Sequence, residues 1–168
     1  MGWAPGEEIW LLGEPAMDAA ALAASELAWR RRLRGGIPTL DLPAAARLIR
    51  LVTGLARRRI INAAHDCSVG GVAVALARMA MTADCGLQAD INGVDGLPAA
   101  AAFGERGGRI LVGVASAGAR DLERASQGAG VAAVRIGVAG GALFDVRFGG
   151  VPMRVPISRL AEAWRTPF

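Results

Sequence analysis

Two periods of apolar and polar positions run along this chain, one typical of strands and the other of helices. Four short apolar runs predict strands at residues 8–13, 87–91, 109–115 and 131–138. The run 109–115 is apolar without alternation after its first residue, which predicts a strand buried on both faces. Near the end of the chain, every second residue is apolar at Phe144, Val146 and Phe148, and again at Val151, Met153 and Val155. This spacing predicts two half-buried strands.

Helical spacing is clearest where Leu48, Leu51, Val52 and Leu55 recur after Asp41. Asp41 suits the N-cap of this helix, which we expect to end near residue 58. A second apolar run after Gly70-Gly71 predicts a largely buried helix with one face at Val72, Leu76 and Met79. Further helices are predicted at residues 17–33, 97–103 and 119–127, and around residues 160–164.

The last third of the chain contains two glycine pairs. Gly140-Gly141 and Gly149-Gly150 each suit a two-residue hairpin turn, because glycine adopts positive φ without a steric penalty. The pattern therefore predicts that the chain ends in a β-meander. Taken with the helices, the order of elements predicts an α/β (α+β) sandwich, a mixed β-sheet flanked by helices. The length of 168 residues favours one domain spanning residues 1–168.

Charge and composition narrow the classes of partner. The net charge is +4, with arginine runs at residues 30–32 and 57–59. These runs indicate either a nucleic-acid surface or cations at helix ends, and we favour the latter because no aromatic side chains alternate with them. No apolar run reaches the roughly 20 residues of a membrane span, and residues 1–8 lack the layout of a signal peptide. Two cysteines without metal-ligand spacing favour the cytoplasm over a disulfide scaffold.

The candidate chemistry lies in the run His65-Asp66-Cys67-Ser68-Val69-Gly70-Gly71, which holds the only histidine of the chain. Compact polar residues and a glycine pair come directly before a predicted helix. At a helix N-terminus, free backbone N–H groups and the positive end of the helix dipole face a ligand. The pattern therefore favours an anion or a metal-bound phosphate at this position.

The same run resembles the motif His-Asp-apolar-Ser-acidic-Gly-Gly of the second carboxy-terminal-type domain of phosphoribosylformylglycinamidine synthase. Further segments are similar to that domain in the same order, at residues 6–13, 24–27, 38–42, 103–109, 136–137 and 160–164. The resemblance covers nearly the whole chain. It implies the fold of the aminoimidazole ribonucleotide synthetase C-terminal domain and membership of a superfamily of ATP-using enzymes.

Three positions depart from the motifs that carry the resemblance. Val69 stands where the family usually has an acidic residue, and Arg78 replaces a glutamate in the helix that follows. Ala24 replaces the glycine before Ser25. An acidic side chain beside a phosphate normally acts through a metal, so Val69 weakens the prediction of a metal role for this loop.

The resemblance implies formation of formylglycinamidine ribonucleotide from formylglycinamide ribonucleotide, ATP and glutamine, with ATP/ADP and Mg as cofactors of the parent enzyme. It implies a catalytic role for His65 and a possible metal contact for Asp66. The residues implied in substrate or phosphate binding are Asp66, Ser68, Gly70, Gly71, Ser25, Glu105 and Arg109. The chain would supply one wall of a nucleotide cleft, and we expect the isolated domain to be inactive.

Each candidate residue also has a structural interpretation. His65 either contacts a ligand or orients the loop through a hydrogen bond. Asp66 either helps to hold a metal-bound nucleotide or caps backbone N–H groups, and Ser68 is the better candidate for the cap. The glycine pair either admits a phosphate or packs closely against the sheet.

Three further residues allow two interpretations each. Glu105 and Arg109 lie four positions apart, which favours a structural ion pair over substrate contact. Cys67 lies where the family has an apolar residue, so we expect it to be buried and not to act as a nucleophile.

The resemblance also implies partners. They are the ATP-binding amino-terminal-type domains of the same enzyme and a glutaminase, and an apolar face left uncovered in their absence makes a homodimer possible. We expect no nucleic acid and no membrane among the partners. The alternative function is a non-catalytic scaffold or pseudo-site domain of the same superfamily, which Val69 favours. A different superfamily member, acting on another acceptor, is a further alternative that the His-Asp-x-Ser form disfavours.

Overall fold

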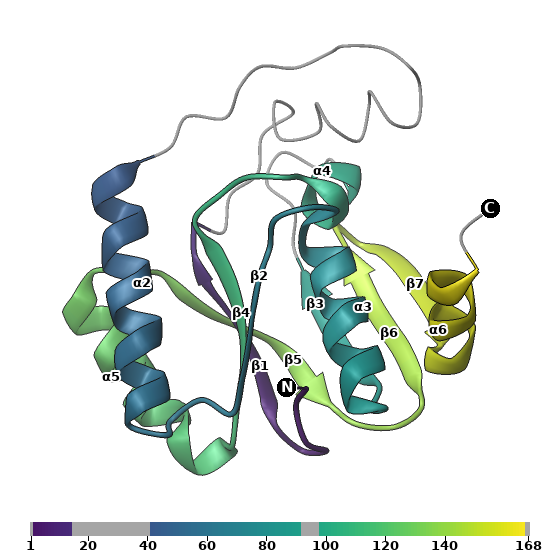
Figure 1. The fold of residues 1–168 in the computed structure, drawn as a ribbon, viewed down its shortest axis with the longest axis horizontal. Helices are drawn as coiled ribbons and strands as arrows, with labels where there is room; N and C mark the ends of the chain where they lie inside the picture. Colours follow the sequence, from purple (N-terminus) through teal and green to yellow (C-terminus); the bar gives the residue numbers. More distant parts are fainter. Residues whose placement is uncertain (1, 15–40, 92–97, 167–168) are drawn as a thin grey trace.

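A seven-stranded mixed sheet organises residues 2–14, 41–91 and 98–166, which are the residues that the computed structural model describes (Figure 1). The strands follow the order β2-β4-β1-β5-β3-β6-β7. Only β3 and β6 pair in parallel, and all other neighbours are antiparallel. The strands are β1 (Glu8–Gly13), β2 (Ala63–Asp66), β3 (Leu87–Ile91), β4 (Arg109–Val114), β5 (Ala133–Ala139), β6 (Leu143–Phe148) and β7 (Val151–Pro156).

Helices cover both faces of this sheet, which confirms the predicted sandwich. Successive side chains of a strand point to opposite faces, so β1 sends Ile9 and Leu11 to one core cluster and Trp10 and Leu12 to the other. The first cluster lies beneath α3 and the second beneath α2 and α5. The helices are α2 (Leu42–Arg57), α3 (Gly71–Ala83), α4 (Pro98–Phe103), α5 (Ala119–Ala129) and α6 (Ile157–Arg165).

The predicted cap of α2 is confirmed. The Asp41 carboxylate accepts a hydrogen bond from the backbone N–H of Ala44 at 2.9 Å, which satisfies one of the free donors at the helix start. The predicted apolar stripe is buried at Leu48, Leu51 and Leu55. Helix α2 therefore forms where its sequence pattern places it.

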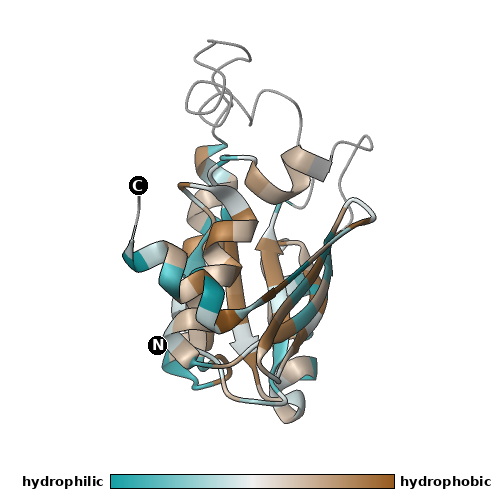
Figure 2. Cartoon of the chain, turned by 90° about the vertical axis from the view of Figure 1, so that its right-hand side faces the viewer, coloured by the Kyte–Doolittle hydropathy of each residue, from teal (hydrophilic) through white to brown (hydrophobic). Residues whose placement is uncertain are grey.

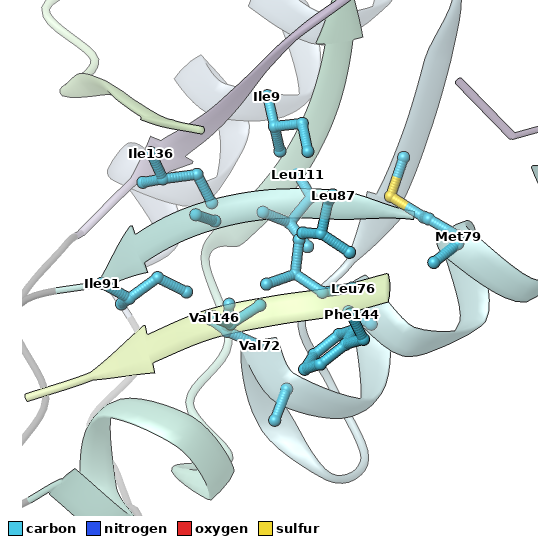
Figure 3. Packing of buried hydrophobic residues seen from close by; sticks show 14 of the residues in the cluster. Ile9, Val72, Leu76, Met79, Leu87, Ile91, Leu111, Ile136, Phe144 and Val146 are labelled. Carbon is cyan, nitrogen blue, oxygen red and sulfur yellow. The ribbon is translucent and has the colours of Figure 1, made fainter. Parts of the chain in front are cut away.

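Helix α3 carries the larger core. Its residues Val72 and Leu76 are fully buried and pack with Phe144 and Val146 of β6 (Figure 3). Hydrophobic residues concentrate on the strands and on the helices packed against them, whereas α6 is largely hydrophilic (Figure 2). No helix in the described ranges is long and apolar enough to cross a membrane.

The predicted β-meander is only partly correct. Gly149 and Gly150 both have positive φ and form the expected turn between β6 and β7. The hairpin expected at Gly140-Gly141 is wrong, because β3 lies between β5 and β6 and pairs with both. Gly86 fits this strand between its neighbours, since a Cβ there would collide with the carbonyl oxygen of Leu143.

Other boundaries shift by only a few residues. The strand expected at residues 131–138 is observed as Ala133–Ala139, and the helix expected at residues 119–127 extends to Ala129. The helix predicted at residues 17–33, with Ser25, lies outside the described residues.

Candidate functional site

The motif segments meet at one end of the sheet. Strand β2 ends at Asp66, which pairs with Ile110 near the start of β4. Strand β1 ends at Gly13, opposite Arg109 at that same start. The connection from β2 to α3 and the connection from α4 to β4 therefore lie side by side, at the upper end of the sheet in Figure 1.

His65 and Asp66 lie on a strand and not in a loop. Sequence reasoning missed β2 because its four residues show no apolar alternation that would mark a strand. The pairing of β2 with the buried strand β4 holds it at the edge of the sheet. The loop proper spans only residues 67–70.

A small polar cluster forms where β2 ends. His65 Nδ1 lies 2.7 Å from the backbone carbonyl oxygen of Asp66, which assigns the proton to Nδ1. The Ser68 hydroxyl donates to the Asp66 carboxylate, and this hydrogen bond is the main cause that lowers the pKa of Asp66. The cluster therefore presents an ionised carboxylate, two-thirds exposed, beside a half-buried imidazole.

The expected side-chain cap of α3 is wrong. The N-cap residue is Gly70, which has no side chain of its own to cap the helix. The Ser68 hydroxyl is directed to Asp66 instead. The N-cap position needs a positive φ of 77°, a conformation that glycine adopts more readily than serine.

The glycine pair packs closely, but Gly71 approaches α4 and not the sheet that its structural interpretation names. Gly71 has a φ of 64°, and a Cβ there would lie 2.8 Å from the carbonyl oxygen of Ala102 in α4. The backbone N–H of Gly70 donates to Oε1 of Glu105 at 2.8 Å. A carboxylate of the chain itself therefore occupies a donor that the sequence assigns to a phosphate.

Arg109, at the start of β4, is almost completely buried. Its guanidinium donates from Nη2 to the carbonyl oxygen of Gly104 at 2.7 Å, and its Nε has no partner among the described residues. Burial lowers the pKa of Arg109. The predicted ion pair with Glu105 is wrong, since Glu105 turns to Gly70 and Arg109 to Gly104.

The prediction that Cys67 is buried is confirmed. Its side chain is buried, and burial raises the pKa of the thiol to about 11 against the smaller opposing effect of Arg109. A thiol in this state is a poor nucleophile at neutral pH. Both cysteines are free, as expected without a disulfide scaffold.

The described residues do not by themselves form a metal site. No group of three or more His, Cys, Asp or Glu side chains lies together in the described ranges. Val69, at the position where an acidic residue was expected, is 82% exposed. A Mg²⁺ ion is typically held by one or two carboxylates together with phosphate oxygens, so Asp66 can serve only as one ligand among others.

A pocket of about 440 Å³ lies at the end of β1, is not lined by residues 65–71 and was not predicted. It opens between the start of α2 and the α4–β4 connection, with Arg47 and Arg106 among its lining residues. Gly13 and Gly108 allow the backbones to meet there, since a Cβ on Gly13 would collide with the Gly108 carbonyl oxygen. In the sequence, Gly13 and Gly108 are the residues that could have indicated this close contact between the two backbones.

Together, the mixed sheet, the two helical layers and the glycine-led α3 beside β2 define a domain of the aminoimidazole ribonucleotide (AIR) synthase type. A family model of this type of domain matches residues 4–145 of the chain. The chain belongs to the family "AIR synthase related protein, C-terminal domain".

Its relatives in sequence are large synthase subunits. The chain is 38% identical over 145 residues to the phosphoribosylformylglycinamidine synthase subunit PurL of Chelativorans sp., covering 81% of this chain and 19% of that protein. It is 33% identical over 171 residues to PurL of Thermomicrobium roseum, covering 99% of this chain and 22% of that protein. The chain thus spans about a fifth of the length of these relatives.

Solved structures agree on the fold. Thermotoga maritima PurL complexed with FGAR superposes with a TM-score of 0.80 at 19% identity, over 95% of this chain and 28% of that one. A thiamine-monophosphate kinase from Stenotrophomonas maltophilia gives a TM-score of 0.57 at 20% identity, over 90% of this chain and 52% of that one.

Proposed function

We propose that this chain is the C-terminal-type domain of an ATP-dependent formylglycinamidine ribonucleotide synthase and supplies one wall of a nucleotide cleft. The observation that carries the proposal is the meeting of β2, the start of α3 and residues 104–109 at one end of the sheet. Similar PurL structures from Thermotoga maritima are complexes with ATP and with ADP, which supports nucleotide as the ligand of the parent enzyme.

In this function the chain's own residues orient and stabilise charge. His65 would face the cleft with Nε2, since Nδ1 is held by the Asp66 carbonyl. Asp66, ionised and exposed, would contact a cation or a donor group of the substrate. Preorganised groups of this kind stabilise the charge that develops in phosphoryl transfer.

The partners belong to the same proposal. The ATP-binding amino-terminal-type domains would face the end of the sheet that carries the motif, and a glutaminase would supply ammonia. A similar structure of PurLQS from Thermotoga maritima supports an assembly of this kind. We place the chain in the cytoplasm as one domain. Two copies would associate when these partners are missing.

The test is ATP-dependent formation of the amidine product by an enzyme that contains this chain together with its ATP-binding half. His65→Ala and Asp66→Ala should each lower kcat by at least about tenfold. Gln88→Ala, an exposed change on β3, is the matched control and should leave the rate unchanged. Full activity in both site variants would contradict the catalytic role.

A second candidate function, a scaffold or pseudo-site domain, rests on a different observation. Glu105 already occupies the Gly70 N–H, and Val69 leaves the loop without its expected carboxylate. Calorimetry with ATP, ADP and Mg²⁺ separates the two functions when the assembled enzyme is used. Absence of binding at this domain, combined with unchanged assembly, would favour the scaffold.

A further inference from the structure

A groove lies between the C-terminal half of α3 and the C-terminal half of α6. Helix α6 lies on the right-hand side of the molecule in Figure 1. The volume of the groove is about 250 Å³. We call it the Arg78 groove, and its lining residues are Arg78, Met81, Thr82, Ala161, Trp164 and Arg165. None of residues 65–71 lines this groove, although the positive charge of Arg78 contributes to lowering the pKa of the Asp66 carboxylate, so the two regions are electrostatically linked.

The Arg78 groove carries positive charge that no carboxylate of the described residues meets in a salt bridge, and the interaction of Arg78 with Asp66 is a longer-range one. None of its lining residues is acidic, and no carboxylate of the described residues pairs with Arg78 or Arg165. The nearest acidic residue of α6, Glu162, pairs with Arg159 at 3.7 Å. Arg78 also stands where the family resemblance expects glutamate, so this charge is a property of this chain.

A contact with an aromatic ring positions Arg78 in this groove. Its guanidinium carbon lies 5.7 Å from the centre of the Trp164 ring, within the range of a cation–π contact. A guanidinium in a cation–π contact still carries N–H donors that match the two oxygens of a carboxylate. The contact also reduces the side-chain freedom that binding would otherwise remove.

We propose that the Arg78 groove binds an acidic peptide segment of a partner protein. Two arginines supply the charge complement, while Met81 and the exposed part of Trp164, which is 58% exposed, offer apolar surface. Tryptophan and arginine are the side chains that most often anchor protein interfaces. The partner segment would place a carboxylate on Arg78 and an apolar side chain against Met81.

Nucleic acid fits the groove less well. Binding to a nucleic acid strand uses open aromatic faces for base stacking along a run of cations. Here the guanidinium of Arg78 already contacts the Trp164 ring, and only two arginines line the groove. The geometry thus provides for one or two carboxylates rather than for a phosphate backbone.

The test uses the full 168-residue chain and a capped peptide, Glu-Glu-Leu-Glu-Glu, at fixed ionic strength. Titration by calorimetry should show binding, and NMR should show a shift of the Trp164 indole N–H. Arg78→Ala should weaken binding by about tenfold, the loss expected for one charge-assisted contact. Arg120→Ala removes one exposed arginine from α5 and should change the affinity by less than about twofold.

Three results would overturn the proposal. One is equal binding of the neutral peptide Gln-Gln-Leu-Gln-Gln. Another is an equal loss in Arg78→Ala and Arg120→Ala, which would reveal only a general charge effect. The third is tighter binding of oligouridylate than of the acidic peptide at the same salt concentration, which would assign the surface to nucleic acid.

Discussion

The carboxylate of Glu105 accepts a hydrogen bond at 2.8 Å from the backbone N–H of Gly70, although 35 positions separate the two residues. The bond joins the α4–β4 connection to the start of α3. An anionic side chain at a helix N-terminus satisfies a free donor and interacts favourably with the helix dipole. Glu105 thereby acts as the cap of α3 that no side chain within residues 67–70 provides.

Removal of this contact should destabilise the chain. Glu105→Ala should lower the free energy of unfolding by about 1–2 kcal/mol, because the N–H of Gly70 loses a charged acceptor. Glu105→Gln keeps an acceptor at the same reach and should lose about half as much. Urea denaturation followed by circular dichroism measures both, and equal stability of Glu105→Ala and the parent chain would contradict this role.

Two glycine substitutions should shift stability in opposite directions. Gly71→Ala places a side chain at positive φ and drives its Cβ against the Ala102 carbonyl, at a cost of at least about 2 kcal/mol. Gly128→Ala, in α5, meets no atom within 4 Å and should stabilise the chain by about 0.5–1 kcal/mol. Thermal unfolding of the two variants tests the pair. An unchanged unfolding temperature in Gly71→Ala would contradict this prediction and would show that α4 can shift to accommodate the added methyl group.

The Cys67 thiol predicts a loss of stability in alkali. Its pKa is raised from 9.0 to about 11 in the folded chain, so the unfolded chain ionises first as the pH increases. Stability should be intact below pH 9 and should fall between pH 9 and 11, with a slope approaching about 1.4 kcal/mol per pH unit. Denaturant titrations across this range measure the slope. It should become shallower in Cys67→Ala, where only Cys85 contributes a raised thiol pKa.

The Asp66 carboxylate should respond to Ser68. Its pKa is lowered mainly by the Ser68 hydroxyl, so Ser68→Ala should raise that pKa towards the ordinary value of 3.8. In the parent chain the associated stability is present above pH 3.8 and is lost as the pH falls through the lowered pKa. An NMR titration of the carboxyl carbon follows the change. Ser116→Ala, in the connection between β4 and α5, is the control and should leave the Asp66 pKa unchanged.

Local elements were predictable because short-range physics determines them. The Asp41 cap, the apolar stripe of α2 and the buried run of β4 each follow from residues within one or two turns or one strand. The Gly149-Gly150 turn was predictable for the same reason. The order of elements predicted the sandwich and the family resemblance implied its particular fold, and the structure confirms both.

Non-local pairings could not be read from the sequence. Strand β2 exists because β4 pairs with it, and β3 lies between β5 and β6 although it precedes both in the chain. Glu105 caps α3 from a distant connection, so Ser68, the nearest candidate in sequence, was the wrong choice. In each case the partner that decides the structure lies far away along the chain.

The central place of β3 also affects how the chain is made. Leu87 pairs with Phe144, so β3 leaves the ribosome long before its parallel neighbour is synthesised. Until residues 143–148 emerge, one side of β3 presents open hydrogen-bonding groups next to buried apolar side chains. The hairpin of β6 and β7 therefore covers this edge of β3, and a chain terminated upstream of it would expose an unpaired strand edge that can pair with other nascent chains.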